Sequence, residues 1–224
     1  PAASESGALA TEDDVFDAAI RRAGMLRVHT TEQLFAAVET LAYARVLHGE
    51  RLAILSNGLG PGVLARDALR YGGGVPATLS PESIMRLDAV LPAGWNGAQP
   101  GNAVRANPVN LFGGAPPERY AAALDVLLAD PQIDAVLVVH SPTATVDSRD
   151  VANAIAPLAR AASRPILSCW LGGASVVAAR AIAAEARMPT YRTPEDGVNG
   201  FLQLVNYRRN QNLLMEVPPS MAGH

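Results

Sequence analysis

The sequence contains no lysine, so all 18 of its basic residues are arginines. This excludes a lysine Schiff base and a lysine-dependent phosphate loop of the Walker type from the chain. The single cysteine, Cys169, excludes an internal disulfide and any metal site that needs several cysteines. Aromatic residues make up only 5% of the chain, but 49% of it is hydrophobic. We therefore expect a folded core built mainly from Ala, Val, Leu and Ile.

The weak net charge and the lack of long apolar runs exclude two further classes of protein. A formal net charge of −3 argues against nucleic-acid binding through bulk basicity. No apolar run approaches the ~20 residues of a membrane helix, and no signal peptide is evident, so we expect no membrane partner and a cytoplasmic location. An Ala/Ser/Gly-rich run opens the chain and residues 216–224 form a breaker-rich tail, which favours a fragment of a longer protein.

Short apolar runs alternate with helical patterns from Glu50 onward, which indicates a three-layer α/β domain with a mostly parallel sheet. We predict five strands in a flavodoxin-like order, preceded by a mainly helical segment at residues 1–48. The runs that could supply the strands are 51–56, 75–79, 109–112, 135–139, 165–170 and 190–192. The predicted helices are 11–24, 31–47, 63–70, 80–90, 116–128, 148–162, 174–186 and 194–215.

The glycine loop after the first predicted strand is the strongest candidate for a binding site. It comprises Ser56, Asn57, Gly58, Gly60 and Gly62, and Val63 follows it. Ligands of open parallel sheets bind at the carboxyl ends of the strands, and the free N–H groups of a following helix favour an anion there. The spacing fits neither a dinucleotide fingerprint nor a Walker loop, and it also suits an ordinary tight turn. Both interpretations stay open at this point.

Several other residues are weaker candidates. The pairs Gly113-Gly114 and Gly172-Gly173 also follow predicted strands, as turns or as parts of a shared anion-binding edge. His140 could reach a ligand at that edge or be a hydrogen-bonded structural residue, and Cys169 is expected to be an inert core thiol. The segment 207–211 carries two arginines and is either a solvated helix face or a docking surface. No spacing predicts a metal site.

The motifs in combination resemble the NDP-forming acyl-CoA synthetase superfamily. Residues 51–65 resemble the glycine loop and helix that open its ligase-CoA domain, and Asn107-Pro-Val-Asn-Leu-Phe-Gly-Gly-Ala115 is similar to its NPVDL-type loop, with Asn110 in place of the usual Asp. Segments 170–173, 189–195 and 207–211 are similar to the tail of that domain. The resemblance implies that residues 1–48 are the remnant of a preceding succinyl-CoA-ligase-like domain, 49–215 the flavodoxin-like ligase-CoA domain and 216–224 a linker.

The resemblance also brings out Glu5. The segment Ser4-Glu5-Ser6-Gly7-Ala8-Leu9 is similar to the SHTGAL loop whose histidine, in the ADP-forming synthetases, carries phosphate from acyl phosphate to ADP. Glu5 falls on that histidine, and a carboxylate cannot form a stable phosphoramidate. In the family, the helix after the glycine loop is one of two whose N-termini face the phosphohistidine, which agrees with an anion site there.

The resemblance implies a parent protein larger than this chain. Its partners would be CoA-binding and ATP-grasp domains, and an acetyltransferase domain if the parent is a bacterial protein lysine acetyltransferase; an oligomer stays open. The parent would use CoA or acyl-CoA, and ATP/ADP with Mg²⁺ if it is a ligase, whereas we expect no cofactor and no catalysis in the isolated chain. Three hypotheses remain: a regulatory or structural part of an acetyltransferase, part of an active ADP-forming ligase, and a stand-alone binding module.

Overall fold

The computed structural model describes residues 13–95 and 106–216, so Glu5 and most of the predicted tail lie outside the described residues. The strands are β1 (Arg51–Ser56), β2 (Val75–Pro76), β3 (Val109–Asn110), β4 (Ala135–His140), β5 (Ile166–Trp170) and β6 (Thr190–Tyr191). The helical elements are α2 (Asp13–Arg22), α3 (Thr31–Tyr43), α4 (Leu59–Tyr71), α5 (Pro81–Val90), α6 (Pro117–Ala129), α7 (Ser148–Ala161), the 3-10 turn η2 (Ala174–Val176), α8 (Val177–Glu185) and α9 (Pro194–Met215).

The sheet is parallel in every pairing, and its main path runs β2-β1-β4-β5-β6. With the short β3 set aside, this is the flavodoxin-like order that the sequence predicted. The described sheet has six strands rather than five, because β2 and β3 share one edge of β1. β2 pairs with the start of β1, at Arg51 and Leu52, and β3 pairs with its end, at Leu55 and Ser56.

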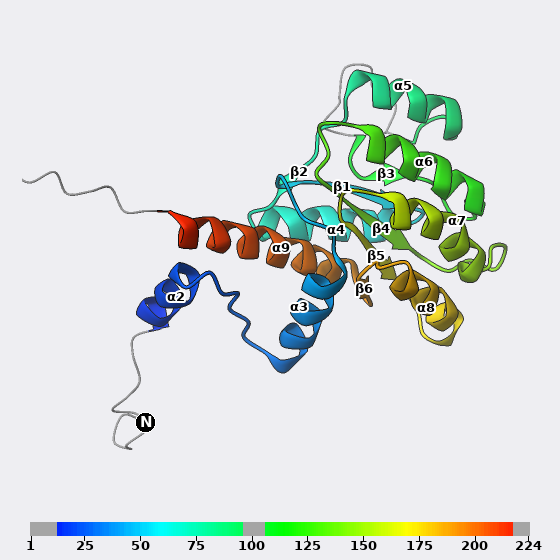
Figure 1. Cartoon of the computed structure of the whole chain (residues 1–224). Helices are drawn as coiled ribbons and strands as arrows, with labels where there is room; N and C mark the ends of the chain where they lie inside the picture. The colour runs from blue at the N-terminus through cyan, green and yellow to red at the C-terminus, as the bar shows by residue number, and fades with distance from the viewer. Residues whose placement is uncertain (1–12, 96–105, 217–224) are drawn as a thin grey trace, which may run out of the picture.

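Two helical layers cover the faces of this sheet, as a three-layer domain requires (Figure 1). On one face, α5, α6, α7 and α8 pack against the side chains of Ala53, Leu55, Val136 and Val138. On the other face, α4 and α9 pack against Leu52, Ile54, Leu137 and Val139. Alternate residues of β1 and β4 thus enter opposite layers, and both central strands read as continuous apolar runs because both faces are buried.

Helices α2 and α3 precede the sheet and lie against α9 (Figure 1). Thr40 on α3 hydrogen-bonds the hydroxyl of Tyr191, and Glu39 accepts the backbone N–H of Thr190 at 3.0 Å. These contacts hold α3 beside the edge strand β6. The prediction that this helix reaches Leu47 was wrong: it ends at Tyr43, and the extended chain that follows places Leu47 in the apolar layer with α4 and α9.

Residues 207–211 lie on α9 and bind the chain's own N-terminal half. Arg209 Nε and Arg208 Nη2 both donate to Glu50, at 2.9 and 3.0 Å, and the two guanidiniums lower the pKa of that carboxyl, Arg209 more strongly. Asn210 donates to the carbonyl oxygen of Met25. This segment is therefore more than a solvated helix face, because its polar groups fasten the residues before the sheet to α9.

Candidate functional site

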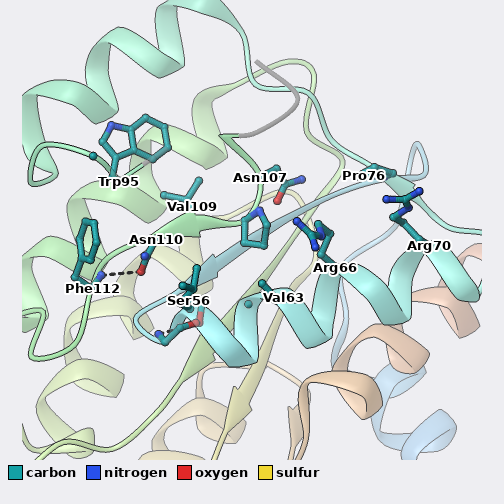
Figure 2. Close-up of a pocket in the computed structure, with 15 residues that line it drawn as sticks. Ser56, Val63, Arg66, Arg70, Pro76, Trp95, Asn107, Val109, Asn110 and Phe112 are labelled. Carbon is teal, nitrogen blue, oxygen red and sulfur yellow. Dashed lines mark hydrogen bonds between the residues drawn. The ribbon is translucent and has the colours of Figure 1, made fainter. Parts of the chain in front are cut away.

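A cleft of about 860 Å³ lies between α4 and the chain that leads into and out of β3 (Figure 2). It opens beside the carboxyl ends of β1 and β3, which is the edge where ligands of open parallel sheets bind. Its described lining comprises Ser56, Gly58, Leu59, Gly62, Val63, Arg66, Arg70, Pro76, Gly94, Trp95, Asn107, Pro108, Val109, Asn110 and Phe112. The cleft therefore collects Ser56, Gly58, Gly62, Val63, Asn107 and Asn110 from the predicted site residues.

The glycine loop is shorter than the sequence predicted. Helix α4 begins at Leu59 rather than Val63, with Gly58 as its N-cap, so Gly60 and Gly62 belong to its first turn. Pro61 fits this first turn because its missing N–H has no acceptor to reach there. The glycines that suggested an open loop are thus part of a regular helix start.

This early start of α4 decides which backbone amides are free to bind an anion. The N–H of Gly62 donates to the carbonyl oxygen of Gly58 at 3.1 Å, and the N–H of Gly58 donates to Ser56 Oγ at 3.1 Å. The amides of Leu59 and Gly60 have no acceptor among the described residues. An anion at this helix end would therefore meet two amides, together with the positive end of the helix dipole.

Asn57 lies outside the cleft and joins two loops at the carboxyl edge of the sheet. Its side-chain oxygen accepts the N–H of Ser141 at 2.8 Å, and its side-chain nitrogen donates to the carbonyl oxygen of Ser141 at 2.8 Å. Asn57 is buried, so these two bonds use groups that would otherwise lack partners. Asn57 thus fixes the loop after β1 to the loop after β4.

Asn107 bridges the gap between β2 and β3 along the edge of β1. Its Oδ1 accepts the N–H of Ile54 at 2.9 Å, and its Nδ2 donates to the carbonyl oxygens of Leu52 and Ala77, both at 2.9 Å. Both amide protons of the buried side chain are committed to the backbone. Asn107 therefore takes the place of missing strand hydrogen bonds, and its amide group has no proton left to donate to a ligand.

Asn110 shapes the turn that follows β3. Its Oδ1 accepts the N–H of Phe112 at 3.0 Å (Figure 2), and Phe112 has a left-handed φ of 62°. A carboxylate could accept the same hydrogen bond, so the Asn in place of the family's Asp keeps this acceptor at the turn. Gly113, Gly114, Gly172 and Gly173 lie in turns after β3 and β5 and do not appear in the cleft's described lining.

The cleft also contains residues that were not among the predicted site residues, and those with charged or aromatic side chains are Arg66, Arg70, Trp95 and Phe112. Arg66 and Arg70 are four residues apart on α4, so they lie on the same face of the helix, and this spacing was visible in the sequence. Trp95 is held by a hydrogen bond from its Nε1 to Asp88 at 2.7 Å. No periodic pattern marks Trp95 or Phe112, because each lies outside a helix or strand.

His140 ends strand β4 inside a buried hydrogen-bonded chain. Its Nδ1 lies 2.7 Å from the Tyr120 hydroxyl and its Nε2 lies 3.0 Å from Ser148 Oγ. Burial lowers the pKa of His140 to about 4, so the ring is neutral at pH 7. His140 is 1% exposed and does not belong to the described lining of the cleft, so it matches the structural interpretation of the two that the sequence left open.

Cys169 is fully buried in β5, and burial raises the pKa of its thiol to about 12. It is the inert core thiol that the sequence predicted. Among the residues described, no three His, Cys, Asp or Glu side chains are grouped so that they could hold a metal ion. Within the same residues, no helix combines the length and the apolar character needed to cross a membrane.

Comparison with known proteins agrees with this architecture. Residues 1–41 match the family described as the succinyl-CoA ligase like flavodoxin domain. The chain is 31% identical over 209 residues to acetate–CoA ligase (ADP-forming) I of Archaeoglobus fulgidus, covering 93% of this chain and 28% of that protein. It is 28% identical over 216 residues to the alpha subunit of acetate–CoA ligase (ADP-forming) II of Pyrococcus furiosus, covering 93% of this chain and 45% of that subunit.

Solved structures show the same likeness. The chain superposes on acetyl-coenzyme A synthetase 1 of Ca. Korarchaeum cryptofilum, solved in complex with phosphate and ADP, with a TM-score of 0.82 and 28% identity. The match covers 96% of this chain and 45% of that one. The fold is thus a flavodoxin-like α/β domain of the kind found in CoA ligases.

The sequence and structure matches together support the NDP-forming acyl-CoA synthetase superfamily as the family of this chain. The chain spans between 28% and 45% of the length of these relatives, so it corresponds to a part of such a protein. These relatives are CoA ligases of the ADP-forming type.

Proposed function

We propose that this chain is the ligase-CoA region of a multidomain acyl-CoA synthetase-like protein that has lost the phosphohistidine shuttle. In this role residues 1–48 end the preceding domain and residues 49–215 form the ligase-CoA domain. The remaining domains would bind CoA and, through an ATP-grasp domain, ATP or ADP with Mg²⁺. The observation that carries the proposal is Glu5 at the position of the family's phosphorylated histidine, within an otherwise matching chain.

The chemistry of Glu5 explains why the shuttle is lost. Histidine accepts a phosphoryl group on a ring nitrogen and passes it on, whereas an acyl phosphate on a glutamate carboxylate would be prone to hydrolysis. Glu5 would instead supply a fixed negative charge. The two free amides at the start of α4, Leu59 and Gly60, fit a carboxylate or a phosphate equally well, since both accept hydrogen bonds from N–H groups.

We further propose that such a protein uses this region for regulation or support rather than for acyl-CoA synthesis, as part of a protein lysine acetyltransferase. Acyl-CoA or CoA would be the ligand of the parent. An active ADP-forming ligase is the second candidate. The observation that favours it is that the matched relatives are ADP-forming ligases along more than 90% of this chain.

The proposal is tested with the full-length protein, assayed for ADP and acetyl-CoA formation from acetate, CoA and ATP, and for covalent phosphate after incubation with labelled ATP. We expect no turnover and no stable protein-bound phosphate with Glu5, because a carboxylate cannot form the phosphoramidate that the histidine forms. Glu5→His should introduce acid-labile, base-stable phosphate on the new histidine.

Glu5→Gln is the matched control, because it removes the charge without adding a nucleophile, and it should stay unphosphorylated. ADP-forming turnover by the natural protein would overturn the proposal in favour of the active ligase. Transfer of acetyl groups from acetyl-CoA to a protein lysine, measured in parallel, decides the acetyltransferase part.

A further inference from the structure

The cleft beside α4 carries positive charge that no acidic side chain of its described lining balances. Arg66 and Arg70 are the charged residues of that lining, which otherwise consists of apolar residues, glycines, Ser56 and two asparagines. Figure 2 shows both arginines rising from α4 on the side that faces Pro76 and Asn107. An anion is the ligand that such a lining attracts.

The guanidiniums of Arg66 and Arg70 make few hydrogen bonds or ion pairs with other described residues. Arg66 donates from Nε at 3.2 Å and from Nη2 at 3.1 Å to Asp67 Oδ1, but both side chains are about two-fifths exposed, so this neighbouring pair is weak. The Arg70 side chain forms no ion pair and no hydrogen bond with any residue described. Arg51 and Arg209 differ, because each binds a carboxylate that is less exposed than Asp67: the side chain of Asp134 is 12% exposed and that of Glu50 is 23% exposed.

The opposite end of the cleft is apolar and aromatic. Trp95 and Phe112 lie away from Arg66 and Arg70 (Figure 2), and the described lining also includes Val63, Pro108 and Val109. A ligand that spans the cleft therefore needs an anionic end and an apolar ring.

We propose that this cleft binds a phosphate ester of a ring compound, with its phosphate between Arg66 and Arg70 and its ring toward Trp95 and Phe112. Paired guanidiniums bind phosphate oxygens through several N–H groups in a fixed plane, which suits a dianion better than a single carboxylate. This site is independent of the proposed function. It uses neither Glu5 nor the amides of Leu59 and Gly60, and the arginines lie two to three turns along α4 from those amides.

The test is calorimetric titration of the 224-residue chain with AMP, with inorganic phosphate and with benzoate. AMP should bind most tightly, because only AMP offers both the dianion and the ring. The double variant Arg66→Gln/Arg70→Gln should weaken AMP binding by about 10- to 100-fold, since two charge-assisted contacts are lost. Arg149→Gln, an exposed arginine on α7, is the matched control and should leave the affinity unchanged.

Phe112→Ala tests the contribution of the ring to binding separately from that of the phosphate. It should weaken AMP but leave inorganic phosphate unaffected, and the unfolding midpoint of each variant shows that it still folds. The proposal is overturned if AMP does not bind, if the double arginine variant binds it as the unchanged chain does, or if benzoate binds more tightly than AMP. Failure of the Glu5 experiment would leave these results as they are, because the titration measures no turnover.

Discussion

At the scale of single residues, His140 links stability to pH. Its folded-state pKa of about 4 lies below the ordinary value of 6.5, so the folded chain takes up this proton less readily than the unfolded chain. The stabilising contribution is complete above pH 6.5 and is lost as the pH falls from 6.5 toward 4. We expect a loss of up to about 3 kcal/mol in the free energy of unfolding across this window.

Urea unfolding at pH 7.0, 6.0, 5.0 and 4.5 measures this effect. His140→Gln should flatten the pH dependence between 6.5 and 5, a range above the ordinary pKa of the carboxylates, although it lowers stability at pH 7 by disturbing the bonds to Tyr120 and Ser148. His29→Gln is the control, because His29 is exposed, and it should keep the full pH dependence. An unchanged slope in His140→Gln would contradict the assignment.

Asn107 is the second residue whose role can be measured alone. Asn107→Ala leaves the N–H of Ile54 and the carbonyl oxygens of Leu52 and Ala77 without their partner inside the protein. Each buried group left unpaired costs about 1–3 kcal/mol, so we expect the free energy of unfolding to fall by about 3–5 kcal/mol. Asn153→Ala, on the exposed face of α7, should change it by less than ~0.5 kcal/mol. A loss below 1 kcal/mol for Asn107→Ala would show that water replaces the amide.

At the scale of elements, the sequence predicted the positions of strands and helix starts accurately wherever the pattern is local. The apolar runs of β1, β4 and β5 and the Ser80-capped and Thr193-capped starts of α5 and α9 are found within a residue or two of the predicted positions. Their signals lie within the element itself: hydrophobic periodicity, a capping hydroxyl and a proline in the first turn.

The start of α4 could not be predicted because its residues favour a loop when they are taken alone. Gly60 and Gly62 weaken a helix, yet Gly62 lies in close contact with Ser56 and Pro108, where a side chain would meet both neighbours at about 3.4 Å. The helix begins early because tertiary packing next to β3 outweighs the local preference. The charged and aromatic cleft residues were missed for a related reason, since the sheet edge that gathers them is assembled from distant segments.

The sequence also does not reveal that β2 and β3 both pair with one edge of β1. β2 and β3 are two residues each, too short to show a period, and α5 lies between them along the chain. Their assignment to one edge depends on which strand they pair with, and the side chain of Asn107 fills the interval. The prediction of five strands was wrong, because β2 and β3 are separate strands on this edge. The predicted flavodoxin-like order depends on the long strands, and it is confirmed.

At the scale of the whole molecule, the helices before the sheet present an apolar face to solvent. No residue of α2 is buried, and on α3 Phe35 is 70% exposed and Val38 58% exposed. Amphipathic helices normally bury such a face. These helices lie mainly within residues 1–41, which match a succinyl-CoA ligase like flavodoxin domain. In the proposed division of the chain they end a domain that precedes residues 49–215. We therefore expect the rest of that domain to cover this face.

The same substitution in two lengths of the protein tests this expectation. Val38→Glu should change the free energy of unfolding of the 224-residue chain by less than ~0.5 kcal/mol, because Val38 is solvated there. In a longer protein that carries the rest of the domain, it should lower the stability by 2 kcal/mol or more, roughly the cost of burying a charge without a partner. Urea unfolding of both lengths gives the two values.

Val177→Glu is the matched control, because Val177 on α8 is 61% exposed but lies outside residues 1–41, which carry the family match. It should be neutral in both lengths, so only a site covered by the added domain separates the two measurements. If Val38→Glu is neutral in both, another surface joins the domains. If it instead dissociates a dimer of the 224-residue chain, a second copy covers the face. The difference between the lengths therefore identifies what the apolar face of α2 and α3 is for, which neither the fold nor the cleft alone decides.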